Sequence, residues 1–182
     1  MFGRMIRPAI AVAVAAAGVV GVQGASATPR GAECQISGSA TISPGLTQTA
    51  RQQSITLSPI ALKGCRSGNA SAPNTAVITG TATTSPNPVT TTASCATGNL
   101  AMTATISWSN GTTTTASVAT KGVTANQAIT GKVSSSSNPS LAAGDTLAGD
   151  VVFKPTTTAQ NCVKVPVTAV TFTGALASGS PK

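Results

Sequence analysis

The 182-residue chain carries 11 Lys and Arg against 3 Asp and Glu, a formal net charge of +8, and it contains no histidine and no tyrosine. Without histidine, the Ser-His-Asp and Cys-His catalytic arrangements are excluded. The basic residues form no run and aromatic residues make up only 2% of the chain, so a nucleic-acid-binding surface is not expected.

The first 27 residues have the organisation of an export signal. Arg4 and Arg7 form a short positive region, an uncharged apolar run follows, and Ala-Ser-Ala at 25–27 matches a signal-peptidase site. The apolar run, about 15 residues, is too short for a membrane-spanning helix. We therefore expect residues 1–27 to be a cleaved signal peptide and residues 28–182 to form one secreted domain, with no transmembrane segment in the mature chain.

The N-terminal part of the mature chain predicts a hairpin. From Cys34 to Ile42, apolar or small residues occupy every second position, which is the period of a strand. Ser-Pro-Gly at 43–45 predicts a turn. The return strand, 53–62, carries apolar residues on both parities, and a one-residue bulge at Pro59 would place them on one face.

The four cysteines predict two disulfides, for which three pairings exist. The hairpin brings Cys34 and Cys65 together at its open end. We therefore expect Cys34–Cys65 and, by elimination, Cys95–Cys162. The absence of histidine and of a CxxC pair argues against a metal site, and no cofactor is expected.

Two elements are expected between this hairpin and Cys95. A strand over residues 75–83 has Ile78 and Ala82 on one face, and Ser-Pro-Asn-Pro at 85–88 ends it. A short extended segment then leads to Cys95.

The clearest strand-turn-strand pattern surrounds Asn110-Gly111. A two-residue loop there would place the apolar residues of the two strands on opposite faces of the hairpin. A three-residue loop, 109–111, pairs Ala104 with Ala116 and keeps these residues on one face. Burial therefore favours the three-residue loop, with Gly111 at its left-handed position.

The C-terminal part predicts three further strands, near residues 127–134, around 147–153 and over 162–173. A low-complexity loop at 134–139 separates the first two, and Pro166 in the last favours an edge or a bulge. About eight or nine short strands and no helical pattern predict an all-β fold. Turn signals at sandwich-like intervals favour an Ig-like antiparallel β-sandwich with two disulfides, and an open β-barrel is the alternative.

Few side chains are candidates for chemistry. Asp145 and Asp150 have the residue type of a glycosidase carboxylate pair, but each follows a glycine, where aspartate is a common turn residue. Trp108 could stack against a sugar, although a single Trp at the end of an alternating strand more often caps the core. No catalytic residue is assigned, and no motif identifies a Ser-Lys dyad.

Arg30, Lys63 and Arg66 form a candidate anion-binding patch. If the first disulfide forms, these residues crowd one end of the first hairpin, with only Glu33 to offset their charge. The alternative interpretation is an ordinary solvated surface. The mature chain would keep nine of the 11 Lys and Arg against 3 Asp and Glu, a net charge of +6, which favours weak attraction to anionic cell-envelope polymers.

Several motifs resemble uncharacterised small secreted proteins of high-GC bacteria: Cys-x-Ile-x-Gly-x-Ala at 34–40, Ser-Pro-Gly-Leu at 43–46 and Ile-Ser-Trp at 106–108. The resemblance covers most of the mature chain and implies a secreted, Ig-like, two-disulfide β-sandwich, but no activity. In size, export and disulfide number the chain is also similar to antibiotic-carrier apoproteins of the neocarzinostatin kind. Their cysteine pairs close short loops, whereas the pairs expected here are far apart in sequence.

The sequence favours a non-catalytic module, secreted or associated with the cell envelope, that acts through its surface. Its partner would be an anionic envelope polymer or another protein. The alternative is a carrier of a small apolar ligand in an Ig-like cleft, and a hydrolase is a remote third class. An apolar cleft with inward-facing polar groups would favour the carrier, an exposed apolar or basic patch the surface module, and convergent Ser, Lys and Asp side chains the enzyme.

Overall fold

The computed structural model describes residues 32–67, 78–123 and 125–180, and every regular element within these ranges is a β-strand. The all-β class predicted from the alternating sequence pattern is therefore confirmed, with ten strands rather than eight or nine. The strands are β1 (Ala32–Leu46), β2 (Arg51–Leu57), β3 (Ile60–Ser67), β4 (Ile78–Ser85), β5 (Val89–Ala93), β6 (Thr97–Trp108), β7 (Thr113–Val123), β8 (Asn126–Ser136), β9 (Thr146–Pro155) and β10 (Val167–Gly179).

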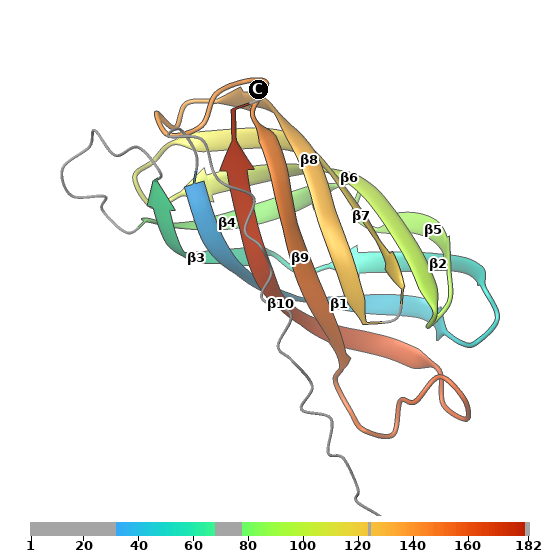
Figure 1. The fold of residues 1–182 in the computed structure, drawn as a ribbon. Helices are drawn as coiled ribbons and strands as arrows, with labels where there is room; N and C mark the ends of the chain where they lie inside the picture. Colours follow the sequence, from blue (N-terminus) through green and yellow to red (C-terminus); the bar gives the residue numbers. More distant parts are fainter. Residues whose placement is uncertain (1–31, 68–77, 124, 181–182) are drawn as a thin grey trace, which may run out of the picture.

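The strands form one antiparallel sheet that closes on itself as a barrel (Figure 1). Eight strands make the closed ring, in the order β10-β9-β8-β7-β6-β4-β3-β1, because β1 also pairs with β10. This closing ladder runs from Glu33 opposite Ala177 to Thr41 opposite Ala169 and, after a register shift, includes Leu46 opposite Val167. The predicted Ig-like sandwich of two separate sheets is not confirmed, since this ladder joins the first and last described strands, β1 and β10, and leaves neither as a free edge. The alternative prediction, a barrel, fits.

Closure of the barrel between β1 and β10 depends on a glycine in β1. Gly38 lies opposite Phe172, and the Phe172 ring occupies the space that a Cβ at residue 38 would need. Phe153 on β9 packs against the same ring, with the ring centroids 5.4 Å apart. The two phenylalanine rings therefore pack together inside the barrel, where the glycine on β1 leaves space for Phe172.

β1 has two successive neighbours on its other edge. Its first part pairs with β3 and its second part with β2, because Pro59 interrupts what would otherwise be one continuous strand. Ile55 and Leu57 before the interruption and Leu62 after it are all buried in the core. The one-residue bulge predicted at Pro59 is instead a break between two strands, but it does return these side chains to the core, and Ile60 packs partly buried against the core.

The central hairpin has the predicted register. Ala104 lies opposite Ala116 in the β6–β7 ladder. The backbone N–H of Trp108 donates to the carbonyl of Thr112 at 2.9 Å, which closes a three-residue loop. Gly111 in that loop has a φ of +80°, the left-handed conformation expected of it.

Three predicted boundaries are wrong. Residues 43–45 belong to an irregular part of β1, in which Gly45 has a φ of +114°, and they do not form the turn. Residues 134–136 extend β8 instead of opening a loop. The last strand begins at Val167 rather than at residue 162, because the Asn161 side chain accepts three backbone N–H groups and holds the following residues in a loop.

Both predicted disulfides are present. Cys34–Cys65 joins β1 to β3 within the barrel wall, with a Cα–Cα distance of 4.1 Å. Cys95–Cys162 joins the β5–β6 turn to the β9–β10 loop, with a Cα–Cα distance of 6.2 Å. Disulfides of this kind are typical of proteins in oxidising compartments.

Some expectations concern residues outside the described ranges. These are the signal peptide at 1–27, Arg30 of the basic patch, and the start of the strand expected at 75–83. In the part of the chain that the structure describes, no helix has the length and apolar character needed to cross a membrane.

Candidate functional site

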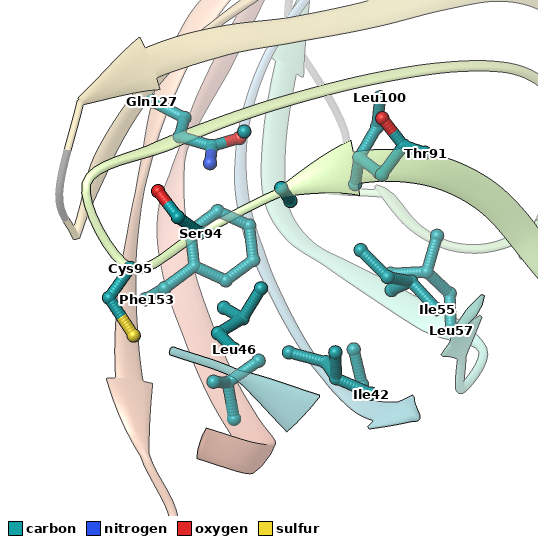
Figure 2. Close-up of a pocket in the computed structure, with 14 residues that line it drawn as sticks. Ile42, Leu46, Ile55, Leu57, Thr91, Ser94, Cys95, Leu100, Gln127 and Phe153 are labelled. Carbon is teal, nitrogen blue, oxygen red and sulfur yellow. The ribbon is translucent and has the colours of Figure 1, made fainter. Parts of the chain in front are cut away.

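A cavity of about 80 Å³ lies inside one end of the barrel (Figure 2). Side chains from β1, β2, β5, β6, β8, β9 and β10 surround it, so strands from the whole length of the chain contribute. Most of the lining is aliphatic or aromatic. The lining residues are Ala40, Ile42, Leu46, Ile55, Leu57, Thr91, Ala93, Ser94, Cys95, Gly98, Leu100, Gln127, Phe153 and Val170.

The cavity lies beside the least tightly paired seam of the barrel. β4 pairs with β6 up to Ser85, but after the Ser-Pro-Asn-Pro segment the chain pairs with β2 instead, as β5. Proline has no N–H to donate to a ladder, so this segment ends the pairing with β6. Across the seam, the Thr91 hydroxyl donates to the Asn99 carbonyl at 2.8 Å, and the Ser94 N–H donates to the Thr97 carbonyl at 2.8 Å. In the described chain no regular β5–β6 ladder is formed.

Gln127 on β8 places an amide group at this apolar cavity. Its Oε1 accepts a hydrogen bond from the Thr120 hydroxyl at 2.8 Å, while its Nε2 has no hydrogen-bond partner among the described residues. Figure 2 shows the amide directed toward the space that the other lining side chains surround. Gly98 leaves room for it, since a Cβ at residue 98 would lie 3.3 Å from Nε2.

The other polar groups of the lining are occupied. The Ser94 hydroxyl oxygen accepts the backbone N–H groups of Ala96 and Thr97, at 3.1 and 3.2 Å, and so holds the β5–β6 turn. The Thr91 hydroxyl donates across the seam to Asn99. No ionisable side chain lies among the lining residues, and Cys95 is held in a disulfide. The cavity therefore offers apolar contact and one spare donor, the Gln127 amide.

The two aspartates considered as a carboxylate pair lie in different parts of the fold, one in a turn and one in a strand. Asp145 is buried in the β8–β9 turn, where its Oδ2 accepts the Ala142 N–H at 2.8 Å and Gly144 before it has a φ of +96°. The turn prediction is confirmed for Asp145 and is wrong for Asp150, which is an exposed residue within β9, opposite Ala175. Neither aspartate lines the cavity.

Trp108 is a core residue rather than an exposed sugar platform. Its side chain is only 5% exposed, and its Nε1 donates to the Thr114 hydroxyl at 2.9 Å. The ring lies against Gly80, where a Cβ would come 2.9 Å from the ring atom Cε3. The core-cap interpretation of Trp108 is thus confirmed.

The predicted basic patch is described in part. Lys63 and Arg66 are exposed on β3, on either side of Gly64, which has a φ of +62°. Glu33 lies directly opposite Arg66 in the β1–β3 ladder. A shallow hollow of about 360 Å³ lies beside this bulge and includes Glu33, Gly64 and Arg66. Of the three predicted residues the structure brings two to one surface, next to a carboxylate.

The sequence pattern did not identify the cavity residues as a site. Alternation marks Ile42, Ile55 and Leu100 only as inward-facing, and it gives no sign that their side chains stop short of filling the barrel. Two signals point to the region: the double-proline break after Ser85, and Gly98 at an inward position of β6.

Comparison of the chain with protein-family models, with curated proteins and with solved structures gave no match. The proposal for its function therefore stands on the cavity and on the surface of the barrel.

Proposed function

We propose that this protein is a non-catalytic, exported binding protein that holds a small, mainly apolar ligand inside its barrel. The observation that carries the proposal is the cavity at the β5–β6 seam, with its apolar lining and the Gln127 Nε2, which has no hydrogen-bond partner among the described residues. Small closed barrels commonly hold one ligand in their interior. An apolar pocket with a few convergent polar groups is the usual form of a small-molecule site.

The lining defines the ligand class. An engineered apolar cavity of about 150 Å³ encloses benzene, so this cavity of about 80 Å³, which is partly open to solvent, takes only the apolar end of a ligand, such as one side of a small ring or the end of an alkyl chain. Since no ionisable side chain lines the cavity, the enclosed part of the ligand is uncharged. The Gln127 Nε2 donor favours a carbonyl, ether or hydroxyl oxygen on that part.

The composition of the chain supports a non-catalytic role. General acid–base chemistry near neutral pH needs a group that titrates there, and the chain has no histidine. All four cysteines are in disulfides. Cys34–Cys65 and Cys95–Cys162 also support export to an oxidising compartment, together with the predicted signal peptide.

A matched pair of probes tests the ligand class. Cyclopentanone and cyclopentane differ by one carbonyl acceptor, and their binding can be followed by chemical-shift titration of the backbone amides around the cavity. We expect cyclopentanone to bind more tightly, by about three- to tenfold, because one neutral hydrogen bond contributes roughly 0.5–1.5 kcal/mol. In Gln127→Leu this preference should disappear while cyclopentane binding persists.

A cavity-filling variant tests the location. Ala93 is 3% exposed and lines the cavity, so Ala93→Leu should abolish binding of both probes by occupying the space. The matched control is Ala128→Leu, which adds the same atoms at an exposed position of β8. If neither probe binds to the native protein, or if the probes bind equally to Ala93→Leu and Ala128→Leu, the cavity is rejected as the site.

Surface action on an anionic envelope polymer is the second candidate. The observation that favours it is the exposed Lys63–Arg66 bulge on β3 with its adjoining hollow. Glu33 opposite Arg66 reduces the net charge of this surface, which makes it the weaker candidate.

A further inference from the structure

The β9–β10 loop, residues 156–166, carries the exposed apolar surface of the described barrel. Val163 is 69% exposed and Val165 is 41% exposed, and in the described chain these are the two large hydrophobic residues with exposed side chains. Lys164 between them is also exposed. Single exposed apolar residues are ordinary, but two on one loop tip with a lysine between them form a small amphipathic surface.

The chain holds this loop tip in a fixed shape. The Asn161 Oδ1 accepts the backbone N–H groups of Val163, Lys164 and Val165, at 3.2, 3.0 and 3.3 Å. The N–H groups of Asn161 and Cys162 donate to the Val165 carbonyl, at 3.2 and 3.0 Å. The Cys95–Cys162 disulfide ties the loop to the β5–β6 turn. The valines are thus presented on an ordered tip, so contact with a partner costs little further ordering of the backbone.

The loop extends beyond the end of the barrel, as Figure 1 shows at the lower right. Lys154 lies two residues before the loop, near the end of β9. Arg51 lies beside the other side of the loop: its Nη2 donates to the Gly45 carbonyl at 3.1 Å, and Gly45 packs against Pro166 and Thr168. With Lys164 at the tip, Lys154 and Arg51 near its base make three cations at this end of the barrel.

The carboxylates are placed elsewhere. Glu33 at the start of β1 and Asp145 in the β8–β9 turn lie at the opposite end of the barrel. Asp150 lies four residues before Lys154 on β9, about 13 Å along an extended strand. That spacing exceeds the Debye length of about 8 Å at physiological salt. The field in front of the loop is therefore positive.

We propose that the 156–166 loop docks the protein on an anionic membrane surface. Val163 and Val165 enter the interface between headgroups and acyl chains, while Arg51, Lys154 and Lys164 lie among the lipid phosphates. Exposed aliphatic side chains beside cations suit a lipid interface, which supplies both an apolar layer and negative charge. An anionic polymer in solution supplies negative charge but no apolar layer for the valines to enter. This inference is independent of the ligand proposed for the cavity.

The test is sedimentation of the mature, disulfide-bonded protein with vesicles of phosphatidylglycerol and phosphatidylcholine, compared with pure phosphatidylcholine. We expect binding to the anionic vesicles only. Val163→Ser with Val165→Ser should lower the partition coefficient by at least tenfold, and Lys164→Gln should lower it by about fivefold, since one cation near such a surface contributes about 1 kcal/mol. Lys132→Gln on β8 removes the same charge away from the loop and is the matched control.

The outcomes separate the proposal from its alternatives. Because the valines are exposed, the double variant should keep the native unfolding temperature, which is measured in parallel. Native binding that needs the cations but not the valines would overturn the membrane proposal in favour of an anionic polymer. No binding to anionic vesicles, or an equal loss in Lys132→Gln and Lys164→Gln, would overturn it as well. Cyclopentanone binding in the cavity is measured separately, so either proposal can fail alone.

Discussion

The side chain of Asn87 takes the place of a strand partner for Leu57. Its Oδ1 accepts the Leu57 N–H at 3.0 Å, and its Nδ2 donates to the Leu57 carbonyl at 2.8 Å. Asn87 stands between the two prolines that separate β4 from β5, at the level where β2 gives way to β3. One amide thus satisfies both backbone groups of a residue that lies where two strand breaks meet, beside the cavity that Leu57 lines.

Asn87→Ala should lower the free energy of unfolding by about 1–3 kcal/mol, because it leaves the backbone N–H and carbonyl of Leu57 without protein partners. Urea denaturation followed by far-UV circular dichroism measures the change. Asn99→Ala, which removes an exposed asparagine side chain from β6, is the matched control and should change the stability by less than about 0.5 kcal/mol. Equal effects of the two substitutions would contradict the role assigned to Asn87.

Gly111→Ala should lower the free energy of unfolding by about 1 kcal/mol. Gly111 has a φ of +80°, and a Cβ there would meet no atom within 4 Å, so the cost is conformational strain rather than a clash. Gly111→Asn should cost less, since asparagine adopts the left-handed conformation more readily. Thermal unfolding of the two variants checks the order. A larger loss for asparagine than for alanine would show that the strain argument is wrong.

The local features were predictable because neighbouring residues decide them. The register around Gly111 follows from a period of two and a single turn, and burial leaves one acceptable loop length. The Cys34–Cys65 bond follows from a hairpin that brings its cysteines together. The interruption at Pro59 follows from a missing N–H. In each case a few residues that are close together in sequence decide the outcome.

Closure of the barrel was not predictable in the same way. Ladders between distant segments decide it, such as Glu33 opposite Ala177, and alternation is the same on the inner face of a barrel and of a sandwich. The start of β10 depends on the Asn161 side chain, whose three backbone N–H partners no pattern of apolar residues reveals. The cavity depends on how completely Phe153 and its neighbours fill the interior, which is a matter of packing rather than of residue type.

The two disulfides should differ in their effect when replaced by serines. In the loop-closure estimate each contributes about 4 kcal/mol, since the sequence separations of 31 and 67 enter only as a logarithm. Cys34 and Cys65 are 4% and 1% exposed, so serines there also bury hydroxyl groups. The Cys34/Cys65 double variant should therefore be the less stable of the two.

Denaturant unfolding of both double variants measures this order, with the cyclopentanone titration as a second measurement. Because Cys95 lines the cavity and Cys34 does not, ligand binding should weaken selectively in the Cys95/Cys162 variant under conditions where both variants are folded. Selective loss of binding in the Cys34/Cys65 variant would contradict the placement of the site.

Neutralising the basic patch tests the second candidate function. Arg30→Gln, Lys63→Gln and Arg66→Gln together should weaken binding to isolated anionic envelope polymer if this surface acts by charge. The native protein's binding should then fall between low and physiological salt, since attraction between exposed charges is screened beyond about 8 Å at 0.15 M.

Within this group, Arg66→Gln alone should have a smaller effect than Lys63→Gln, because Glu33 opposite Arg66 already offsets its charge, whereas Gln35 lies opposite Lys63. Pull-down with increasing salt measures both effects. Salt-insensitive binding, or equal losses for the two single variants, would reject the charge mechanism at this surface and leave the cavity as the site of function.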